Sequence, residues 1–189
     1  ALLQADISYD QANDALDIKE FALTSGTLAL SGQLQGLALQ TKPALEGNLK
    51  LARFSPRQWM EEFNLTVPET ADPKVLQVFD FSASIDAGDD HVTFKNIEMK
   101  LDQTLVKGEF ELINFAKPNY LFSLDVGEMN LDRYLPPSSP DAPPAKGKGQ
   151  GGSGNEALFP VETLRQLTMD GKLLIDYLTI NQLLSLIHI

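Results

Sequence analysis

The sequence predicts a mainly β protein: a repetitive, antiparallel, curved sheet that forms an open, taco-like groove, with short helices at the unit boundaries. Three features lead to this prediction. Apolar and polar residues alternate over most of the chain, the alternating pattern recurs at a nearly constant offset, and turn residues separate the stretches at short spacing. Short connections favour antiparallel neighbours, because a parallel pair needs a longer crossover. With 43% hydrophobic residues among 189, the chain can build a core.

The repeat is visible when the sequence is shifted against itself by 76 positions. Phe21 then falls on Ile97 and Gly32 falls on Gly108, without a gap between them. Further along, the offset becomes 75, and at an offset of 88 a third copy begins late in the chain. We therefore expect superposable units in which these pairs occupy equivalent positions.

The chain divides into two units, an insertion and the start of a third unit. Unit 1 spans about residues 1–71, unit 2 about 72–135, the insertion about 136–157, and the third unit about 158–189. Up to residue 155 the insertion contains only Gly, Pro, Ala, Ser and polar residues. Because such a composition cannot offset the entropy of ordering, we expect a flexible excursion that folding does not require.

A brief helix is predicted near the end of unit 1. Ser55 suits the N-cap, Pro56 suits the first helical position, and Gln58 stands where a capping-box partner would reach back. Trp59 and the apolar residues after it form a stripe. The stretch that follows Asn130 is the shorter counterpart in unit 2. Such helices are suited to covering the edge or end of a sheet.

The alternating apolar residues form the candidate binding surface. Leucine at every second position suits equally an open groove and a sealed core, so both interpretations stand at this point. The residues predicted to line a groove are Leu28, Leu30, Leu34, Leu45, Leu49, Leu51, Phe110, Leu112, Tyr120, Phe122, Leu124 and Val126.

Composition and spacing argue against several kinds of site. A net charge of -11 repels phosphate backbones, so nucleic acid is not an expected partner, and the absence of Cys excludes thiolate metal sites. The G-x-G-x-x-G string at residues 147–152 follows prolines and has no strand before it. The Asp86, Asp89, Asp90 and His91 cluster matches no metal motif and is typical of a hairpin tip. We therefore expect no catalytic residue, no metal, no cofactor and no enzymatic activity.

A stretch near the C-terminus resembles the AsmA family of bacterial envelope proteins. In that family, a phrase of the form L-P-V-E-x-L-R-x-L-x-x-x-G-x-L-x-I-x-x-L-x-[IV]-N-x-L follows a similar Pro- and Gly-rich insertion. Gln182 departs from the family pattern, in which Gly is usual. The matching residues are Pro160, Val161, Glu162, Leu164, Arg165, Leu167, Gly171, Leu173, Ile175, Leu178, Ile180, Asn181 and Leu183.

The resemblance implies a location and a function. It implies a periplasmic β region, anchored to the inner membrane by a helix outside this segment, with a role in outer-membrane lipid homeostasis. Related TamB-like proteins are described as bridges whose curved sheet forms a hydrophobic groove. The expected function is one section of an envelope-spanning β groove that binds or conducts phospholipid and supports outer-membrane assembly. The alternative is a scaffold or assembly factor for outer-membrane proteins that carries no lipid.

Overall fold

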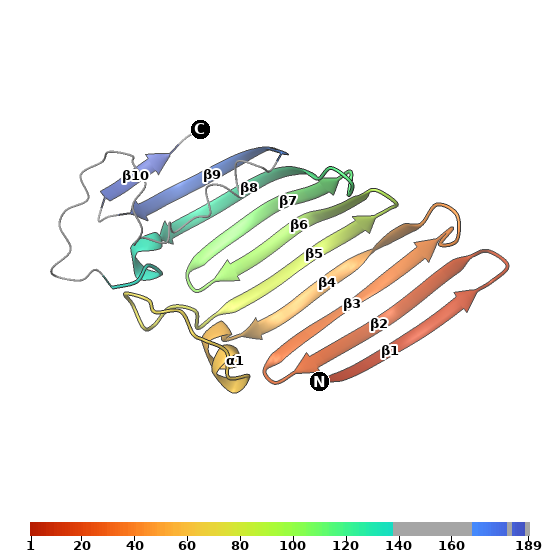
Figure 1. Ribbon diagram of the computed structural model, residues 1–189, viewed down its shortest axis with the longest axis horizontal. Coiled ribbons are helices and arrows are strands. Elements are labelled where there is room, and N and C mark those ends of the chain that lie inside the picture. The colour runs from red at the N-terminus through yellow and green to blue at the C-terminus, as the bar shows by residue number, and fades with distance from the viewer. Residues whose placement is uncertain (138–167, 181–182, 188–189) are drawn as a thin grey trace.

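The computed structural model describes residues 1–137, 168–180 and 183–187 of the chain. Within these residues, ten strands form a single open sheet in which every strand lies beside its neighbour in the sequence (Figure 1). The predicted mainly β, repetitive sheet is therefore confirmed. The strands are β1 (Leu2–Asp10), β2 (Ala15–Ser25), β3 (Leu28–Leu37), β4 (Ala44–Phe54), β5 (Phe79–Ala87), β6 (His91–Leu101), β7 (Thr104–Ile113), β8 (Asn119–Asn130), β9 (Thr168–Ile180) and β10 (Leu183–Ile187).

The strand register bears out the 76-residue repeat. Phe21 on β2 is paired with Gly32 on β3, and the equivalent Ile97 on β6 is paired with Gly108 on β7. A β-bulge precedes each pair, between Ile18 and Phe21 in unit 1 and at the corresponding residues of unit 2. Since a bulge shifts the register locally, its recurrence shows that the units share their irregularities as well as their regular pairing.

The shift to an offset of 75 is also found in the structure. Gly32 is paired with Leu49 of β4, and Gly108 is paired with the equivalent Leu124 of β8. Each of these strands is followed by a helix at the same offset, α1 (Pro56–Glu62) after β4 and the shorter 3-10 helix η1 (Leu131–Arg133) after β8. As predicted, the hydroxyl of Ser55 caps α1 by accepting a hydrogen bond from the N–H of Gln58 at 3.2 Å.

The third unit departs from the repeat. Strand β9 lies beside β8, as β5 lies beside β4, but β9 runs parallel to β8, with Thr168 opposite Asn119. The predicted antiparallel pairing is therefore wrong for β9. The segment between α1 and β5 turns back near the end of β4, whereas residues 134–167 separate η1 from β9, a connection long enough for a parallel crossover. The predicted insertion lies in that stretch and almost entirely outside the described residues.

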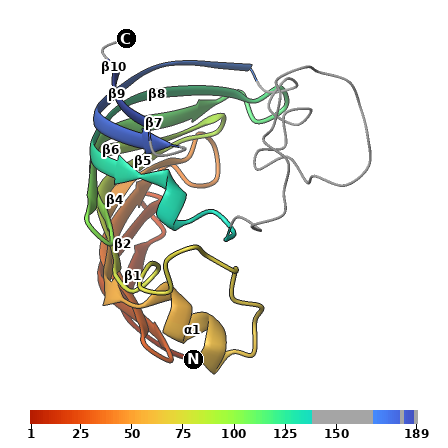
Figure 2. The ribbon, with the colours of Figure 1, turned by 90° about the vertical axis from the view of Figure 1, so that its left-hand side faces the viewer.

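The sheet is a single curved layer. Figure 2 shows that α1, the segment that follows it and η1 all lie on the concave side, near one end of the strands. No second sheet packs on either face within the described residues. A sealed sandwich, in which two sheets bury a common core, is therefore not the architecture of this part of the chain.

Candidate functional site

One face of the sheet is apolar from β1 to β9. Residues that are paired across antiparallel strands point to the same face, so a row can be followed from strand to strand. One such row contains only Gly, Ala and larger apolar or aromatic residues. Its members are Tyr9, Leu16, Gly36, Leu45, Ala87, Val92, Leu112, Tyr120 and Met169.

The opposite face is polar along the neighbouring row. This row contains a single apolar residue, Leu121, and is otherwise made of acidic, amide and hydroxyl side chains. Its members are Ser8, Asp17, Gln35, Glu46, Asp86, Thr93, Glu111, Leu121 and Asp170. The two faces of the sheet therefore differ in chemistry from β1 to β9.

All residues predicted to line a groove lie on the apolar face. Their register places Leu30 beside Leu51 in unit 1, and Phe110 beside Phe122 in unit 2. The same face holds further apolar side chains on β2, β5, β6 and β9 that the sequence analysis did not name as groove residues. Alternation in these strands is the signal that identifies them: Leu16, Ile18, Phe21, Leu23, Phe81, Ile85, Phe94, Leu173 and Ile175.

The apolar face is only partly covered. The buried apolar residues of the described chain are Val75, Ala83, Ile97, Val106 and Val126, and all except Val75 lie on this face. Because the covering segments lie on the concave side (Figure 2), we identify the apolar face as the concave one. Towards β1 and β9 the face is open, since Leu3 is 65% exposed and Met169 is 47% exposed.

A polar clamp holds the covering segments at one end of the strands. Asp102, only 6% exposed, lies in the turn between β6 and β7. Its carboxylate accepts hydrogen bonds from the N–H groups of Leu76, Gln77 and Val78 at 2.8–3.1 Å and from the Tyr134 hydroxyl at 2.7 Å. The clamp therefore joins the segment before β5 to the segment after η1.

The electrostatics of the clamp follow from burial and hydrogen bonding. Burial by itself raises the pKa of Asp102, but the bonds from Tyr134 and from the three backbone N–H groups lower this pKa more, so it lies below its ordinary value. Burial and the adjacent carboxylate of Asp102 raise the pKa of Tyr134. Asp102 is thus ionised and Tyr134 protonated near neutral pH, so the Asp102 carboxylate accepts the hydrogen bond that the Tyr134 hydroxyl donates.

Glycines let aromatic rings lie flat along the apolar face. A Cβ on Gly171 would lie 2.6–2.7 Å from ring atoms of Phe122, its partner on β8. A Cβ on Gly32 would lie 2.9 Å from the ring of Phe21 and 2.2 Å from the carbonyl oxygen of Asn48. Each ring therefore packs over the glycine of the adjacent strand, where a larger residue would not fit.

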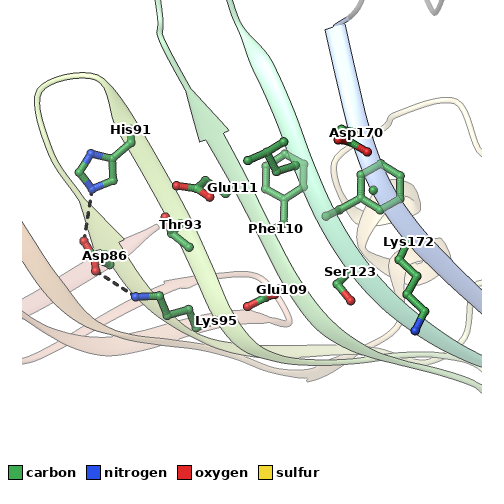
Figure 3. Close-up of a pocket in the computed structure, with 13 residues that line it drawn as sticks. Asp86, His91, Thr93, Lys95, Glu109, Phe110, Glu111, Ser123, Asp170 and Lys172 are labelled. Atoms are coloured by element: carbon green, nitrogen blue, oxygen red, sulfur yellow. Dashed lines mark hydrogen bonds and ion pairs between the residues drawn. The ribbon is translucent and has the colours of Figure 1, made fainter.

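The polar face carries a shallow depression over β5 to β9, with a volume of about 700 Å³ (Figure 3). Asp86 lies there between two basic side chains, with Lys95 Nζ at 3.1 Å and His91 Nε2 at 3.4 Å. The hydrogen bonds from these two partners lower the pKa of Asp86. Asp86 thus forms an ion pair with Lys95, and His91 lies between Asp86 and Asp90, whose Oδ1 is 3.5 Å from His91 Nδ1. The described residues contain no group of three or more His, Cys, Asp and Glu suited to a metal ion.

A scan against protein-family models and searches of curated proteins and of solved structures each found no match for the chain. Among the described residues, no helix has the length and apolar character needed to cross a membrane.

Proposed function

We propose that the concave apolar face binds the acyl chains of phospholipid, and that this chain forms one section of a longer hydrophobic β groove. The observation that carries the proposal is an apolar face that continues from β1 to β9, with no second sheet over it in the described residues. A large apolar patch that is exposed to solvent marks an interaction surface.

The dimensions of the sheet suit an acyl chain. Neighbouring strands lie about 4.8 Å apart, so the ten strands extend over roughly 43 Å. One leaflet of a bilayer contributes about half of a hydrocarbon core of about 30 Å, so an acyl chain needs only about 15 Å of apolar surface. Each buried methylene contributes about 0.8 kcal/mol, which makes one well-covered chain a substantial source of binding free energy.

The resemblance to the AsmA family supports the same proposal from a different direction. It leads us to propose a periplasmic location, attachment to the inner membrane through a helix outside this segment, and transfer of phospholipid between the two membranes. No catalytic step is needed for this function, because an acyl chain only has to move from the apolar interior of the bilayer to the apolar face of the sheet.

The proposal is tested by one substitution on the apolar face and a control on the polar face. Phe122 and Ser123 are neighbours on β8 whose side chains point to opposite faces. Phe122→Asp should leave the protein folded, with a loss of stability of about 2 kcal/mol, because the new carboxylate remains partly hydrated. It should also lower the amount of co-purified phospholipid several-fold, whereas Ser123→Asp should not.

Two measurements on these proteins separate the possible results: lipid extraction with mass spectrometry, and melting followed by circular dichroism. Phospholipid absent from the wild-type protein after mild purification would overturn the proposal and favour the scaffold function. A collapsed melt for Phe122→Asp would show that the face is sealed at this position. A folded Phe122→Asp protein with undiminished lipid would show that the acyl chains bind elsewhere.

A further inference from the structure

A single charged side chain, Glu128, stands among the paired positions of the apolar face in the described part of β1 to β9. Glu128 continues the alternation of Phe122, Leu124 and Val126 along β8. No bulge interrupts the pairing of β8 with β9, so its side chain points to the same face as theirs. Glu128 is exposed, and its carboxylate makes no hydrogen bond or ion pair with any described residue, while its backbone carbonyl accepts a hydrogen bond from the Thr104 hydroxyl at 2.9 Å. Within the described residues, a carboxylate without a side-chain partner thus marks one end of an otherwise uncharged strip.

The residue beside this carboxylate is aromatic. Glu128 is paired with Tyr177 of β9, and the Tyr177 side chain is 48% exposed. Adjacent strands lie about 4.8 Å apart, so the two side chains start from neighbouring positions on the same face. A carboxylate and the face of an aromatic ring are both attractive to a cation, and an ammonium group can contact both at once.

The equivalent position in unit 1 does not have this arrangement. Arg53 corresponds to Glu128 at the offset of 75, but a register shift between Leu51 and Phe54 changes the local direction of β4. The Arg53 guanidinium instead pairs with Asp80 at 3.0 Å, and Asp80 belongs to the polar face. The exposed carboxylate on the apolar face is therefore specific to unit 2 and is not a consequence of the repeat.

We infer that Glu128 and Tyr177 bind the ammonium group of a phospholipid head group of the ethanolamine type, while the acyl chains lie on the strip beyond the buried Val126, which begins at Leu124 and its exposed β9 partner Leu173. This inference rests on the proposed lipid-binding function and deepens it by naming the class of lipid. The net charge of -11 acts in the same direction, because it disfavours lipids whose head groups carry only negative charge.

The test is a competition between two lipids. The chain is incubated with vesicles of phosphatidylethanolamine and phosphatidylglycerol in equal amounts, re-isolated, and its bound lipid is quantified by mass spectrometry. The lipid bound to the wild-type protein should be enriched in phosphatidylethanolamine by roughly fivefold over the vesicles. This is the size of effect expected from an ion pair and a cation–π contact at a partly exposed site. Glu128→Gln should bring the ratio close to that of the vesicles, and Glu128→Lys should favour phosphatidylglycerol.

The control is Asp125, an exposed residue three positions earlier on β8 that lies on the opposite face and carries the same charge. Asp125→Asn and Asp125→Lys should leave the lipid ratio unchanged, so an effect confined to position 128 identifies a local contact rather than net charge. Tyr177→Leu should lower the enrichment less than Glu128→Gln does. Equal effects at positions 125 and 128 would overturn the inference.

The outcomes distinguish this inference from the function on which it rests. If the wild-type protein binds no lipid, both the head-group contact and the proposed lipid-binding function are overturned. Bound lipid with a ratio that Glu128→Lys does not change would overturn the head-group contact and leave the apolar groove intact. Free phosphoethanolamine, which has the amine but no acyl chain, should not compete at millimolar concentration. Full competition by it would show that the site recognises a soluble amine and not a lipid.

Discussion

Units 1 and 2 share their strands, their bulges and the placement of a helix after the fourth strand, but they differ at the positions where the sheet ends. The turn between β2 and β3 has Gly26 where the turn between β6 and β7 has Asp102, and both residues have positive φ, 59° and 53°. Asp102 joins two covering segments, and Gly26 has no side chain that could do so. The comparison shows that the repeat preserves backbone geometry, while the side chains at the strand ends distinguish one unit from the other.

The shared backbone is most sensitive at its glycines. Gly108 has φ 146°, and a Cβ there would lie 2.0 Å from the carbonyl oxygen of Ser123, so Gly108→Ala should lower the free energy of unfolding by more than about 3 kcal/mol. Gly32→Ala should also destabilise, since its Cβ would lie 2.2 Å from the Asn48 oxygen. Urea unfolding measures both effects. Gly127→Ala is the control, because its Cβ would meet no atom closer than 3.6 Å. Similar stability for all three variants would contradict the close contacts at Gly32 and Gly108, and a loss at only one of these two positions would break the equivalence of the units.

The clamp is the next largest difference between the units. Asp102→Gly gives unit 2 the turn residue of unit 1, and it should lower the free energy of unfolding by about 2–4 kcal/mol, because three partly buried N–H···O bonds and the bond from the Tyr134 hydroxyl lose a charged acceptor. Asp102→Asn should cost less, since an amide oxygen can still accept. Thermal melts of the two variants check the order. If Asp102→Gly melts like the wild type, the clamp contributes little and the units are held in the same way.

Acid should remove the same contribution without any substitution. The pKa of Asp102 is lower in the folded chain than in the unfolded one, so its carboxylate stabilises the protein above its unfolded pKa, near 4, and this stability is lost as the pH falls through the folded pKa. The stability difference between wild type and Asp102→Asn should thus be constant from about pH 6 to 8 and shrink below about pH 4. Denaturant midpoints across this range test the trend, and a difference that grows in acid would contradict it.

The smallest expected effect concerns the surface pair of unit 1. Arg53 pairs with Asp80 at 3.0 Å, but its side chain is 64% exposed, so Arg53→Ala should change the free energy of unfolding by less than about 1 kcal/mol. Urea unfolding at low and high salt measures the pair. A larger loss, insensitive to salt, would indicate that the aliphatic part of Arg53 packs against the sheet.

Much of the architecture was predictable from local patterns. Alternation places side chains on opposite faces regardless of the rest of the fold, which explains why every residue predicted for the groove lies on one face. The Ser55 cap follows from chemistry confined to a few residues, and so do the hairpin connections that hold Lys42-Pro43 before β4 and Lys117-Pro118 before β8. The direction of β9 was not predictable in this way, because it depends on where a long connection returns to the sheet and not on the residues of the strand itself.

The candidate site divides in the same manner. Leucine at every second position predicts an apolar face but does not distinguish a groove from a core. That distinction depends on what lies over the face, and within the described residues this is a partial cover made of α1, the segment before β5 and η1. Glu128 also required the structure, because its neighbour Tyr177 comes from a strand 49 positions away in the sequence.

The sequence by itself determined the repeated units, the alternation of the strands and the side of the sheet to which each side chain points, since these follow from the period of the backbone and from turn chemistry. Only the tertiary structure decided that the sheet is a single curved layer, that Asp102 joins its covering segments, and that an exposed carboxylate ends the apolar strip. The physical reason is that burial and pairing depend on groups distant in sequence. A local pattern specifies which way a side chain points, but not what it meets there.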